Sequence, residues 1–234
     1  VPLIPVHHVR GHIAANYITH PDLEPPFLCL CVSGGNTLIV DVQDYTKMEL
    51  LGATRDDAAG ECFDKVARVL GIGYPGGGPM DRLAQGGDEK KYQLPRAKVD
   101  GAPLDFSFSG LKTAALNLIH SAEQKKEPLD LPSFAASFSR AVADELVPRA
   151  MEAAEQCGRT KIAAAGGVAA NSKIRAELER ACQISGKQLY LPKLSLCGDN
   201  GAMIGCQAYY EYLAGRRGDW SLNGYANRDI SADV

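Results

Sequence analysis

The order of apolar and polar positions predicts an alternation of strands and helices. Two apolar runs between Pro26 and Val42 flank the turn Ser-Gly-Gly-Asn-Thr, and paired glycines at such a turn are typical of a β-hairpin. The first residues, VPLIP, are apolar as well and predict a strand that leads into the segment VHHVRGHIAA. Because such a strand has no earlier partner in this sequence, we interpret the chain as the later part of a longer protein.

Helical periodicity dominates the middle of the chain. In the stretch DDAAGECFDKVARVLG, apolar residues recur at helical spacing and a glycine follows them, which predicts a helix that ends at Gly71. Further helices are expected after Pro79 and from Gly110, the second behind a short strand-like run DFSF, followed by an exposed connection at 121–131. A long helix should then cover 133–156 and be kinked or interrupted near its internal proline.

Two units of strand, turn and helix follow. The stretch TKIAAAGGVAANSKIRAELERAC has an apolar run, a double glycine and a helical pattern, and KQLYLPKLSLCGDNGAMIGCQAYYEYL repeats the theme. In open α/β sheets this arrangement places a ligand at the carboxyl end of a strand. Asn171 then lies where it can hydrogen-bond a polar ligand edge. Asp199 lies at the start of a helix, where an N-cap role is the structural alternative.

Composition narrows the class of protein. With 234 residues, 45% hydrophobic residues and a formal charge of −3, the chain can form one large domain or two small ones. No apolar run approaches the roughly 18 residues of a membrane span and the start shows no signal-peptide pattern, so we expect a cytoplasmic protein without a membrane partner. The charge shows no basic excess, which neither indicates nor excludes nucleic-acid binding.

The seven cysteines are scattered, odd in number and without a CxxC pair. A disulfide framework or a cysteine zinc site would need closer grouping or an even count. We therefore expect reduced and mostly buried thiols.

Three histidines within six positions form the first candidate site. If the segment is helical, His8 and His12 are four residues apart and lie on one face. Zinc enzymes use two such histidines and a third ligand from elsewhere in the chain, and they leave one position open for substrate or water. The alternative is an ordinary helix with partly buried histidines.

Glycine-rich turns form the second candidate site. Successive N–H groups from Ser33 to Gly35 can form a nest for phosphate oxygens, with hydroxyl donors at Ser33 and Thr37, although a plain hairpin turn explains the same residues. The triple glycine in YPGGGP indicates that the backbone comes close to a ligand or to another segment. Asp64 lies beside the apolar stripe of its helix, where it can bind a ligand or pair with Arg68.

Each of these features is weak alone, but their order along the chain is specific: HHVRGH, CVSGGNT, FDK, GGVAAN and GDNGAM. In this combination the sequence resembles the bacterial branch of the tRNA N6-adenosine threonylcarbamoyltransferase family over nearly the whole chain. The resemblance implies an α/β fold of the two-lobed class shared by actin, the Hsp70 chaperones and sugar kinases (the ASKHA fold). The present chain would comprise mostly the C-terminal lobe and part of the N-terminal lobe.

The resemblance also implies a division of the chain. Residues 1–26 would be a remnant of the N-terminal lobe with the metal-binding helix, 27–215 the C-terminal lobe with a helical insertion around 70–135, and 216–234 a C-terminal segment. Family members begin earlier, with a strand and a glycine-bearing loop that supply the other phosphate-binding hairpin, and that part is missing here.

Site residues follow from the resemblance position by position. It implies one divalent metal ion, iron or zinc, held by His8, His12 and Asp199, with His7 outside the site. It implies that threonylcarbamoyl-AMP or another adenine nucleotide is bound by Cys31, Val32, Ser33, Gly34, Gly35, Asp64, Gly77 and Asn171. For Asp64 it favours a ribose or hydroxyl contact over the ion pair with Arg68. The family writes YPGGP where this chain has YPGGGP, so Gly78 is the alternative to Gly77.

The implied reaction transfers the threonylcarbamoyl group from threonylcarbamoyl-AMP to N6 of adenosine 37 in tRNAs that read ANN codons, with assistance from the metal. Implied partners are tRNA, an inactive paralogous subunit and a small P-loop ATPase. Basic residues between 60 and 115 are the predicted contacts to the tRNA backbone, with a solvated charged face as the alternative. They are Lys65, Arg68, Arg82, Lys90, Lys91, Arg96, Lys98 and Lys112.

Three further functions stay open. A zinc peptidase would explain the histidine pair, but its HExxH motif needs a glutamate where this chain has Val9. A kinase of the same fold would explain the phosphate loops and would leave the histidines unused. A non-catalytic partner subunit would explain a degenerate site, whereas the three metal ligands are retained here.

Overall fold

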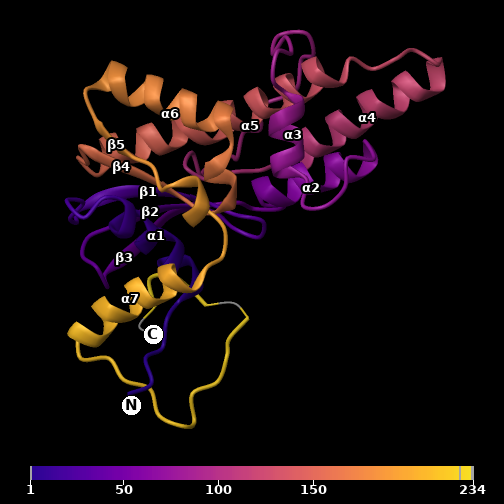
Figure 1. Cartoon of the computed structure of the whole chain (residues 1–234). Helices are drawn as coiled ribbons and strands as arrows, with labels where there is room; N and C mark the ends of the chain where they lie inside the picture. The colour runs from indigo at the N-terminus through magenta and orange to yellow at the C-terminus, as the bar shows by residue number, and fades with distance from the viewer. Residues whose placement is uncertain (1, 227, 233–234) are drawn as a thin grey trace.

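A mixed five-stranded sheet forms the centre of the protein, seen in a computed structural model that describes residues 2–226 and 228–232 (Figure 1). The strands lie in the order β3-β2-β1-β4-β5. β1 pairs antiparallel with β2 and parallel with β4, β2 pairs antiparallel with β3, and β4 pairs parallel with β5. Their bounds are Phe27–Val32, Thr37–Val42, Met48–Ala53, Lys161–Ala165 and Gln188–Tyr190 for β1 to β5.

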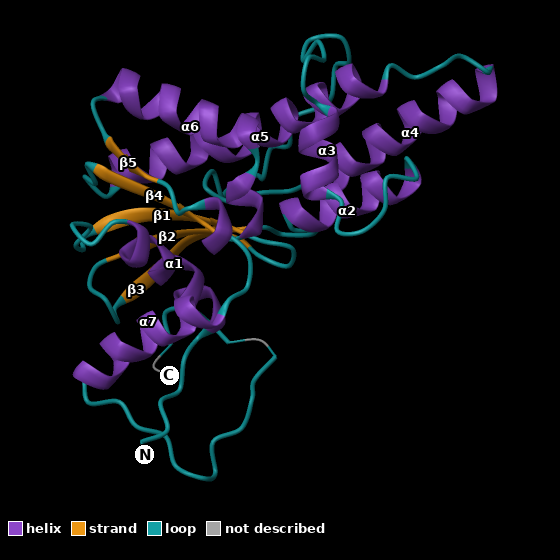
Figure 2. Ribbon diagram, in the orientation of Figure 1, coloured by secondary structure: helices purple, strands orange, loops and turns teal. Residues whose placement is uncertain are grey.

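Helices cover both faces of the sheet. α5 and α6 lie on one side and α1 and α7 on the other, while α2, α3 and α4 extend away beyond one end of the strands (Figure 2). The seven helices found in the described residues are α1 His8–Thr19, α2 Ala59–Val69, α3 Gly77–Leu83, α4 Ser109–Lys125, α5 Leu131–Gln156, α6 Ser172–Ser185 and α7 Gly201–Leu213. Two 3-10 turns, η1 Gly167–Ala170 and η2 Leu194–Leu196, precede α6 and α7. Within the described part of the chain, no helix combines the length and the apolar character needed to cross a membrane.

Two hydrophobic clusters lie on the two faces of the sheet. The even-numbered residues of β1 pack toward α2, α5 and α6, and the odd-numbered residues pack toward α1. Because both faces are covered, every residue of β1 is buried, which is why this strand reads as an unbroken apolar run. α1 contributes Val9, Ile13, Ala14 and Tyr17 to the second cluster. The division at residue 26 into a lobe remnant and a C-terminal lobe stays a prediction.

The structure confirms the predicted hairpin, since β1 and β2 pair from Val32 and Thr37 outward. The strand expected at VPLIP is wrong for the described residues 2–5, because among them only Leu3 forms an isolated bridge, with Gly218. The strand-like run DFSF likewise forms only an isolated bridge, between Phe106 and Thr54. The sequence pattern did not predict β3, whose exposed Glu49 and Leu50 stand side by side and break the alternation of a half-buried strand.

Helix boundaries differ from the predicted ones by a few residues. α3 begins at Gly77, before the proline that was expected to precede it, and α4 continues to Lys125, which shortens the predicted exposed connection. Asp130 caps α5 by accepting a hydrogen bond from the Ser133 amide at 3.2 Å. Pro148 lies inside α5 without interrupting the helix.

The seven cysteines are all free thiols, and five of them are buried. Burial raises the pKa of Cys31 and Cys62 to about 12 in each case. The expectation of reduced and mostly buried thiols is therefore confirmed.

Gly166 carries the turn that leaves β4. Its φ of +90° is a backbone angle that glycine adopts readily and other residues rarely adopt. A Cβ at this position would also lie 2.3 Å from the carbonyl oxygen of Val32 at the end of β1. The turn can therefore pass directly beside β1, and this proximity brings the start of α6 next to the β1–β2 turn.

Replacing Gly166 by alanine should lower the free energy of unfolding by about 1–3 kcal/mol, because the backbone conformation is strained for an L-residue and the Val32 carbonyl cannot move aside cheaply. The neighbouring Gly167→Ala is the matched control, since open space surrounds the position of its Cβ. Urea unfolding of the two variants measures the difference. Equal stability of both variants would contradict this account of the turn.

Candidate metal and nucleotide site

The first turns of α1 present the histidine pair. The rings of His8 and His12 are 4.8 Å apart and perpendicular. His12 is buried, whereas the side chain of His8 is half exposed. His7 is the N-cap of α1: its Nδ1 accepts a hydrogen bond from the Val9 amide at 3.2 Å, and its Nε2 lies 2.9 Å from the carbonyl oxygen of Arg228. Both nitrogens of His7 are thus engaged away from the pair.

Asp199 approaches the pair from the start of α7. Its Oδ1 lies 3.2 Å from Nε2 of His8 and 3.1 Å from Nε2 of His12, and the three donor atoms all lie within 4.8 Å of one another. The N-cap alternative for Asp199 is wrong, because the side chain of Asn200 caps α7 by accepting a hydrogen bond from the Met203 amide at 2.9 Å. The carboxylate of Asp199 is therefore not used for capping and faces the histidines.

Close packing of α1 against α7 makes this meeting possible. A Cβ on Gly11 would lie 2.8 Å from Cδ1 of Ile204, so the glycine between the two histidines allows α7 to approach. Arg10, which is buried, pairs with the equally buried Glu211 of α7 at 3.3 Å. Its guanidinium also donates to the carbonyl oxygens of Ile230, at 2.6 and 3.0 Å, and of Ala232, at 2.8 Å. The C-terminal segment is thereby fastened to the same helix.

The donor set fits a divalent metal. Two imidazole nitrogens and one carboxylate oxygen suit zinc or iron and leave coordination positions open. Burial lowers the pKa of His12, and the nearby His8 lowers it further, against the opposing effect of Asp199. The neutral imidazole that a metal requires is therefore the favoured form near neutral pH.

A cavity of about 290 Å³ lies on the far side of the β1–β2 turn from this cluster. Four segments that are distant in the sequence form its wall: the β1–β2 turn, α2, the YPGGGP turn and η1. The lining residues are Gly34, Gly60, Phe63, Asp64, Pro75, Gly77, Gly78, Gly167, Val168, Ala170 and Asn171. The cavity thus unites four of the residues that the resemblance assigned to nucleotide binding, namely Gly34, Asp64, Gly77 and Asn171.

Asn171 has two roles in this wall. Its Oδ1 accepts hydrogen bonds from the amides of Lys173 and Ile174, both at 3.1 Å, and so caps α6. Its Nδ2 is buried and has no hydrogen-bond partner among the described residues. A buried amide donor without a partner costs free energy, so this group is set up to bind a ligand in the cavity.

Asp64 fixes the YPGGGP turn, because its Oδ1 accepts a hydrogen bond from the Gly76 amide at 2.6 Å. Gly76 packs so closely on α2 that a Cβ there would lie 2.3 Å from Cβ of Ala67. An ion pair of Asp64 with Arg68 is not found within the described part of the chain. Gly77 and Gly78 both face the cavity with room around them, so either can be the binding glycine.

The β1–β2 turn offers fewer hydrogen-bond donors for a phosphate than the sequence predicted. The Ser33 amide donates to the carbonyl oxygen of Asn36 at 2.8 Å, and the hydroxyl oxygen of Thr37 accepts from the Ala59 amide, so neither group is directed to a ligand. Gly34 and Gly35 remain exposed with open space at their Cβ positions. Cys31 and Val32 are buried inside β1, and the structure does not bring them to the cavity.

Four of the eight basic residues predicted to contact tRNA form ion pairs with carboxylates. Lys65 lies 2.7 Å from Asp57, Lys112 also contacts Asp57, Lys91 lies 2.7 Å from Asp130, and Arg96 lies 3.8 Å from Asp144. Although burial alone would raise it, the hydrogen bonds from Lys112 and Lys65 hold the pKa of Asp57 below its usual value. These pairs favour a solvated charged face.

Proteins of a known family resemble this chain in sequence. The family model of tRNA N6-adenosine threonylcarbamoyltransferase matches residues 1–206. The chain belongs to this family. A protein from Clostridium botulinum with that name is 50% identical over 226 residues, which cover 97% of this chain and 66% of the relative. A namesake from Clostridium perfringens is 49% identical and is covered to 67%. The chain thus spans about two thirds of the length of these curated relatives.

Solved structures support the predicted fold class. Full-length HypF in a phosphate- and nucleotide-bound form has a TM-score of 0.68 at 15% identity, over 89% of this chain and 36% of that chain. HypF of T. kodakarensis has a TM-score of 0.66 at 17% identity, over 92% and 37%. Component A of (R)-2-hydroxyglutaryl-CoA dehydratase from Acidaminococcus fermentans has a TM-score of 0.52 at 19% identity, over 90% and 70%. The ASKHA fold expected for the family is confirmed.

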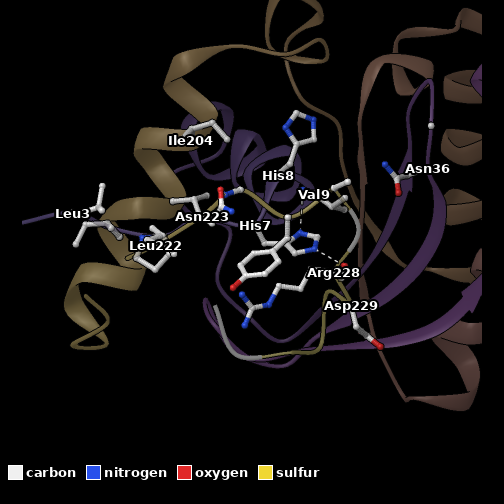
Figure 3. Close-up of a pocket in the computed structure, with 17 residues that line it drawn as sticks. Leu3, His7, His8, Val9, Asn36, Ile204, Leu222, Asn223, Arg228 and Asp229 are labelled. Carbon is white, nitrogen blue, oxygen red and sulfur yellow. Dashed lines mark hydrogen bonds between the residues drawn. The ribbon is translucent and has the colours of Figure 1, made fainter. Parts of the chain in front are cut away.

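Removal of His12 should abolish tight metal binding, whereas removal of His7 should not. We expect His12→Ala to weaken the affinity for Zn²⁺ or Fe²⁺ by more than the roughly 10- to 100-fold typical of a lost outer-shell partner. His7→Ala should bind metal like the parent, and it should lose the cap of α1, about 1 kcal/mol of stability, together with the hydrogen bond to the carbonyl oxygen of Arg228 (Figure 3). Isothermal titration of the metal-free chain tests both. Equal losses in the two variants would contradict the ligand assignment.

Proposed function

We propose that the site transfers a threonylcarbamoyl group from threonylcarbamoyl-AMP to N6 of adenosine 37 in tRNAs that read ANN codons. Membership of the family supports this reaction. The structural observation that carries the proposal is the cavity beside the β1–β2 turn, which Asp64 and Asn171 both line and where Asn171 holds a buried amide donor without a partner among the described residues.

The cavity suits the adenosine part of the donor. Phe63 and Val168 give it apolar walls that can cover a flat base, and Asn171 Nδ2 supplies a hydrogen-bond donor for a ring nitrogen or a ribose oxygen. Asp64 can accept a hydrogen bond from a ribose hydroxyl while it holds Gly76. Base and sugar would thereby be fixed before any reaction.

The phosphate of the donor would lie at the β1–β2 turn. Gly34 and Gly35 can offer backbone amides there, and α2 begins against this turn, since a Cβ on Gly60 would lie 2.7 Å from Cα of Gly34. The N-terminus of a helix favours negative charge. This end of the site is therefore suited to hold an anion.

His8, His12 and Asp199 would hold the divalent ion, which when bound supplies positive charge to oppose the negative charge that develops during acyl transfer. In the transfer itself, N6 of adenosine forms a bond to the carbamoyl carbon and loses a proton. The bond from that carbon to the phosphate oxygen breaks, and AMP leaves with the electron pair. The contribution of the chain is to align the two reactants and to neutralise charge.

Partners are proposed on the resemblance alone. They are tRNA as acceptor, an inactive paralogous subunit and a small P-loop ATPase, and a tRNA substrate would place the reaction in the cytoplasm. A kinase, a metallopeptidase and a non-catalytic subunit are the competing functions. The two enzymes predict different reaction products, and the non-catalytic subunit predicts none.

The substitution Asn171→Asp tests the site proposed for threonylcarbamoyl-AMP. It keeps the side-chain oxygen that caps α6 and removes the amide group that can donate a hydrogen bond to the ligand. We expect unfolding like that of the parent and an AMP affinity weaker by roughly 5- to 100-fold, from the lost hydrogen bond. Calorimetric titration with AMP measures the affinity. An unchanged affinity would contradict the role of Asn171.

Nucleoside mass spectrometry tests the reaction. The full-length protein, threonylcarbamoyl-AMP and unmodified tRNA should yield the modified adenosine, and His8→Ala/His12→Ala should lose it. If the double variant still forms the product, the metal is not needed for the reaction. Absence of product with the parent and its partners would favour a binding subunit, whereas phosphorylation would indicate a kinase and peptide cleavage a metallopeptidase.

A further inference from the structure

The segment 191–199 leads from the end of β5 to the candidate metal ligand Asp199 and on to α7 (Figure 1). We call it the metal loop. Its backbone is irregular except for the 3-10 turn η2, so contacts with other segments decide where Asp199 lies. Such contacts come from α1 on one side and from α6 on the other.

The C-terminal end of α1 holds the start of the metal loop. The hydroxyl oxygen of Thr19 accepts a hydrogen bond from the Lys193 amide at 3.1 Å. Nε2 of His20 donates to the carbonyl oxygen of Leu191 at 2.9 Å. Because α1 also carries the histidine pair, these contacts place the metal loop relative to the other two ligands.

Arg175 of α6 holds the metal loop from the other side. Its Nη2 donates to the carbonyl oxygen of Pro192 at 2.6 Å and lies 3.5 Å from Sγ of Cys197. Its Nε donates to the carbonyl oxygen of Ala169 in η1 at 2.8 Å. The residues on either side of Ala169 line the cavity proposed for adenosine. One guanidinium therefore joins the wall of that cavity to the metal loop.

The position of Arg175 in its helix supports a bridging role. It is the fourth residue of α6, near the positive end of the helix dipole, where a cation is less favourable than an anion. Lys173 and Arg180 on the same helix both pair with Glu177, whereas Arg175 donates to the backbone of two other segments. A planar guanidinium presents several donors in fixed directions, which a lysine ammonium does not reproduce.

The backbone of Arg175 is also joined to the cavity. Its amide donates to the carbonyl oxygen of Asn171 at 3.1 Å. Asn171 is the residue whose buried amide group is proposed to bind the ligand. A ligand that fixes Asn171 and η1 would therefore hold the first turn of α6, from which the guanidinium reaches the metal loop.

We propose that Arg175 is a positioning residue that couples nucleoside binding in the cavity to metal binding at Asp199 and the histidine pair. This inference rests on the proposed function, which places ligands at both sites. A nucleoside that orders η1 also orders the metal loop through the guanidinium, and a bound ion favours the same arrangement of η1. Coupling of this kind is reciprocal, so each ligand raises the affinity for the other by the same factor.

The Zn²⁺ affinity of the full-length protein, titrated calorimetrically with and without saturating adenosine, tests the coupling. Adenosine replaces AMP as the probe because it has no phosphate that would attract the ion directly. In the parent we expect adenosine to tighten Zn²⁺ binding by roughly 5-fold or more, the lower end of the range typical of coupled sites. In Arg175→Lys this factor should fall to nearly 1, because an ammonium keeps the charge and cannot hold both carbonyl groups.

Arg180→Lys is the matched control, because Arg180 lies on the same helix, its side chain is 64% exposed and it pairs with Glu177. This variant should keep the coupling factor of the parent. Zn²⁺ that still binds to His12→Ala lies outside the site and is subtracted. A merely structural role of Arg175 would weaken binding of both ligands and leave the factor unchanged, and that result would overturn the proposal.

Hydrogen exchange gives a readout that needs neither ligand. The amides of Leu196 and Cys197 are hydrogen-bonded within the metal loop. Their exchange should be roughly 5- to 100-fold faster in Arg175→Lys and Arg175→Gln, the effect of one or two lost hydrogen bonds. Exchange in the β1–β2 hairpin should stay unchanged, which identifies the variants as folded. Unchanged exchange at Leu196 and Cys197 would overturn the anchoring role of Arg175.

The parent protein separates the two levels of the proposal. A parent that binds adenosine and Zn²⁺ independently of each other would overturn only the coupling through Arg175. A parent that binds neither adenosine nor AMP would instead be a failure of the proposed function.

Discussion

The packing of α1 against α7 is the contact on which the candidate metal site depends. Neither helix holds all three ligands: the histidines come from α1, and Asp199 precedes α7. Gly11 permits the helices to approach, and the buried pair of Arg10 and Glu211 joins them from within. A buried ion pair adds little net stability compared with apolar packing, but its hydrogen-bond geometry is specific, and Glu211 also lies 3.1 Å from Arg216 and accepts a hydrogen bond from Gln207 at 2.8 Å. The pair therefore fixes which residues of the two helices face each other.

The position of the cavity beside the β1–β2 turn follows from the sheet. β1 and β4 are parallel neighbours, so their carboxyl ends lie at one edge, and the turns that follow them meet there. Gly166 lets the turn after β4 pass against the end of β1, and Gly60 lets α2 begin against the β1–β2 turn. The cavity that Asp64 and Asn171 line results from these close approaches.

The sequence predicted the hairpin, the principal helices and the final strand, turn and helix units, because these rest on local periodicity and on glycine. It predicted the positions of the metal and nucleotide residues only through the family resemblance, since spacing alone left ordinary alternatives for each. It did not predict the hydrogen-bond partners of individual polar groups, whether those partners are near in the sequence or far apart. The Ser33 amide is used by Asn36, Asn200 rather than Asp199 caps α7, and Arg10 meets a partner 201 positions away. Neither the hydrophobic periodicity nor the composition of the sequence contains a signal for any of these contacts.

The long sequence separation within the metal site has a consequence for its assembly. Arg10 bonds to Ile230 across 220 positions, and Asp199 meets His8 across almost the whole chain. Contacts of this separation carry a higher loop-closure cost than local ones and slow folding. During synthesis the histidine pair leaves the ribosome long before its third ligand. A metal at this candidate site would therefore be loaded only after the segment that joins α1 to α7 has been made, and its binding would report a finished fold.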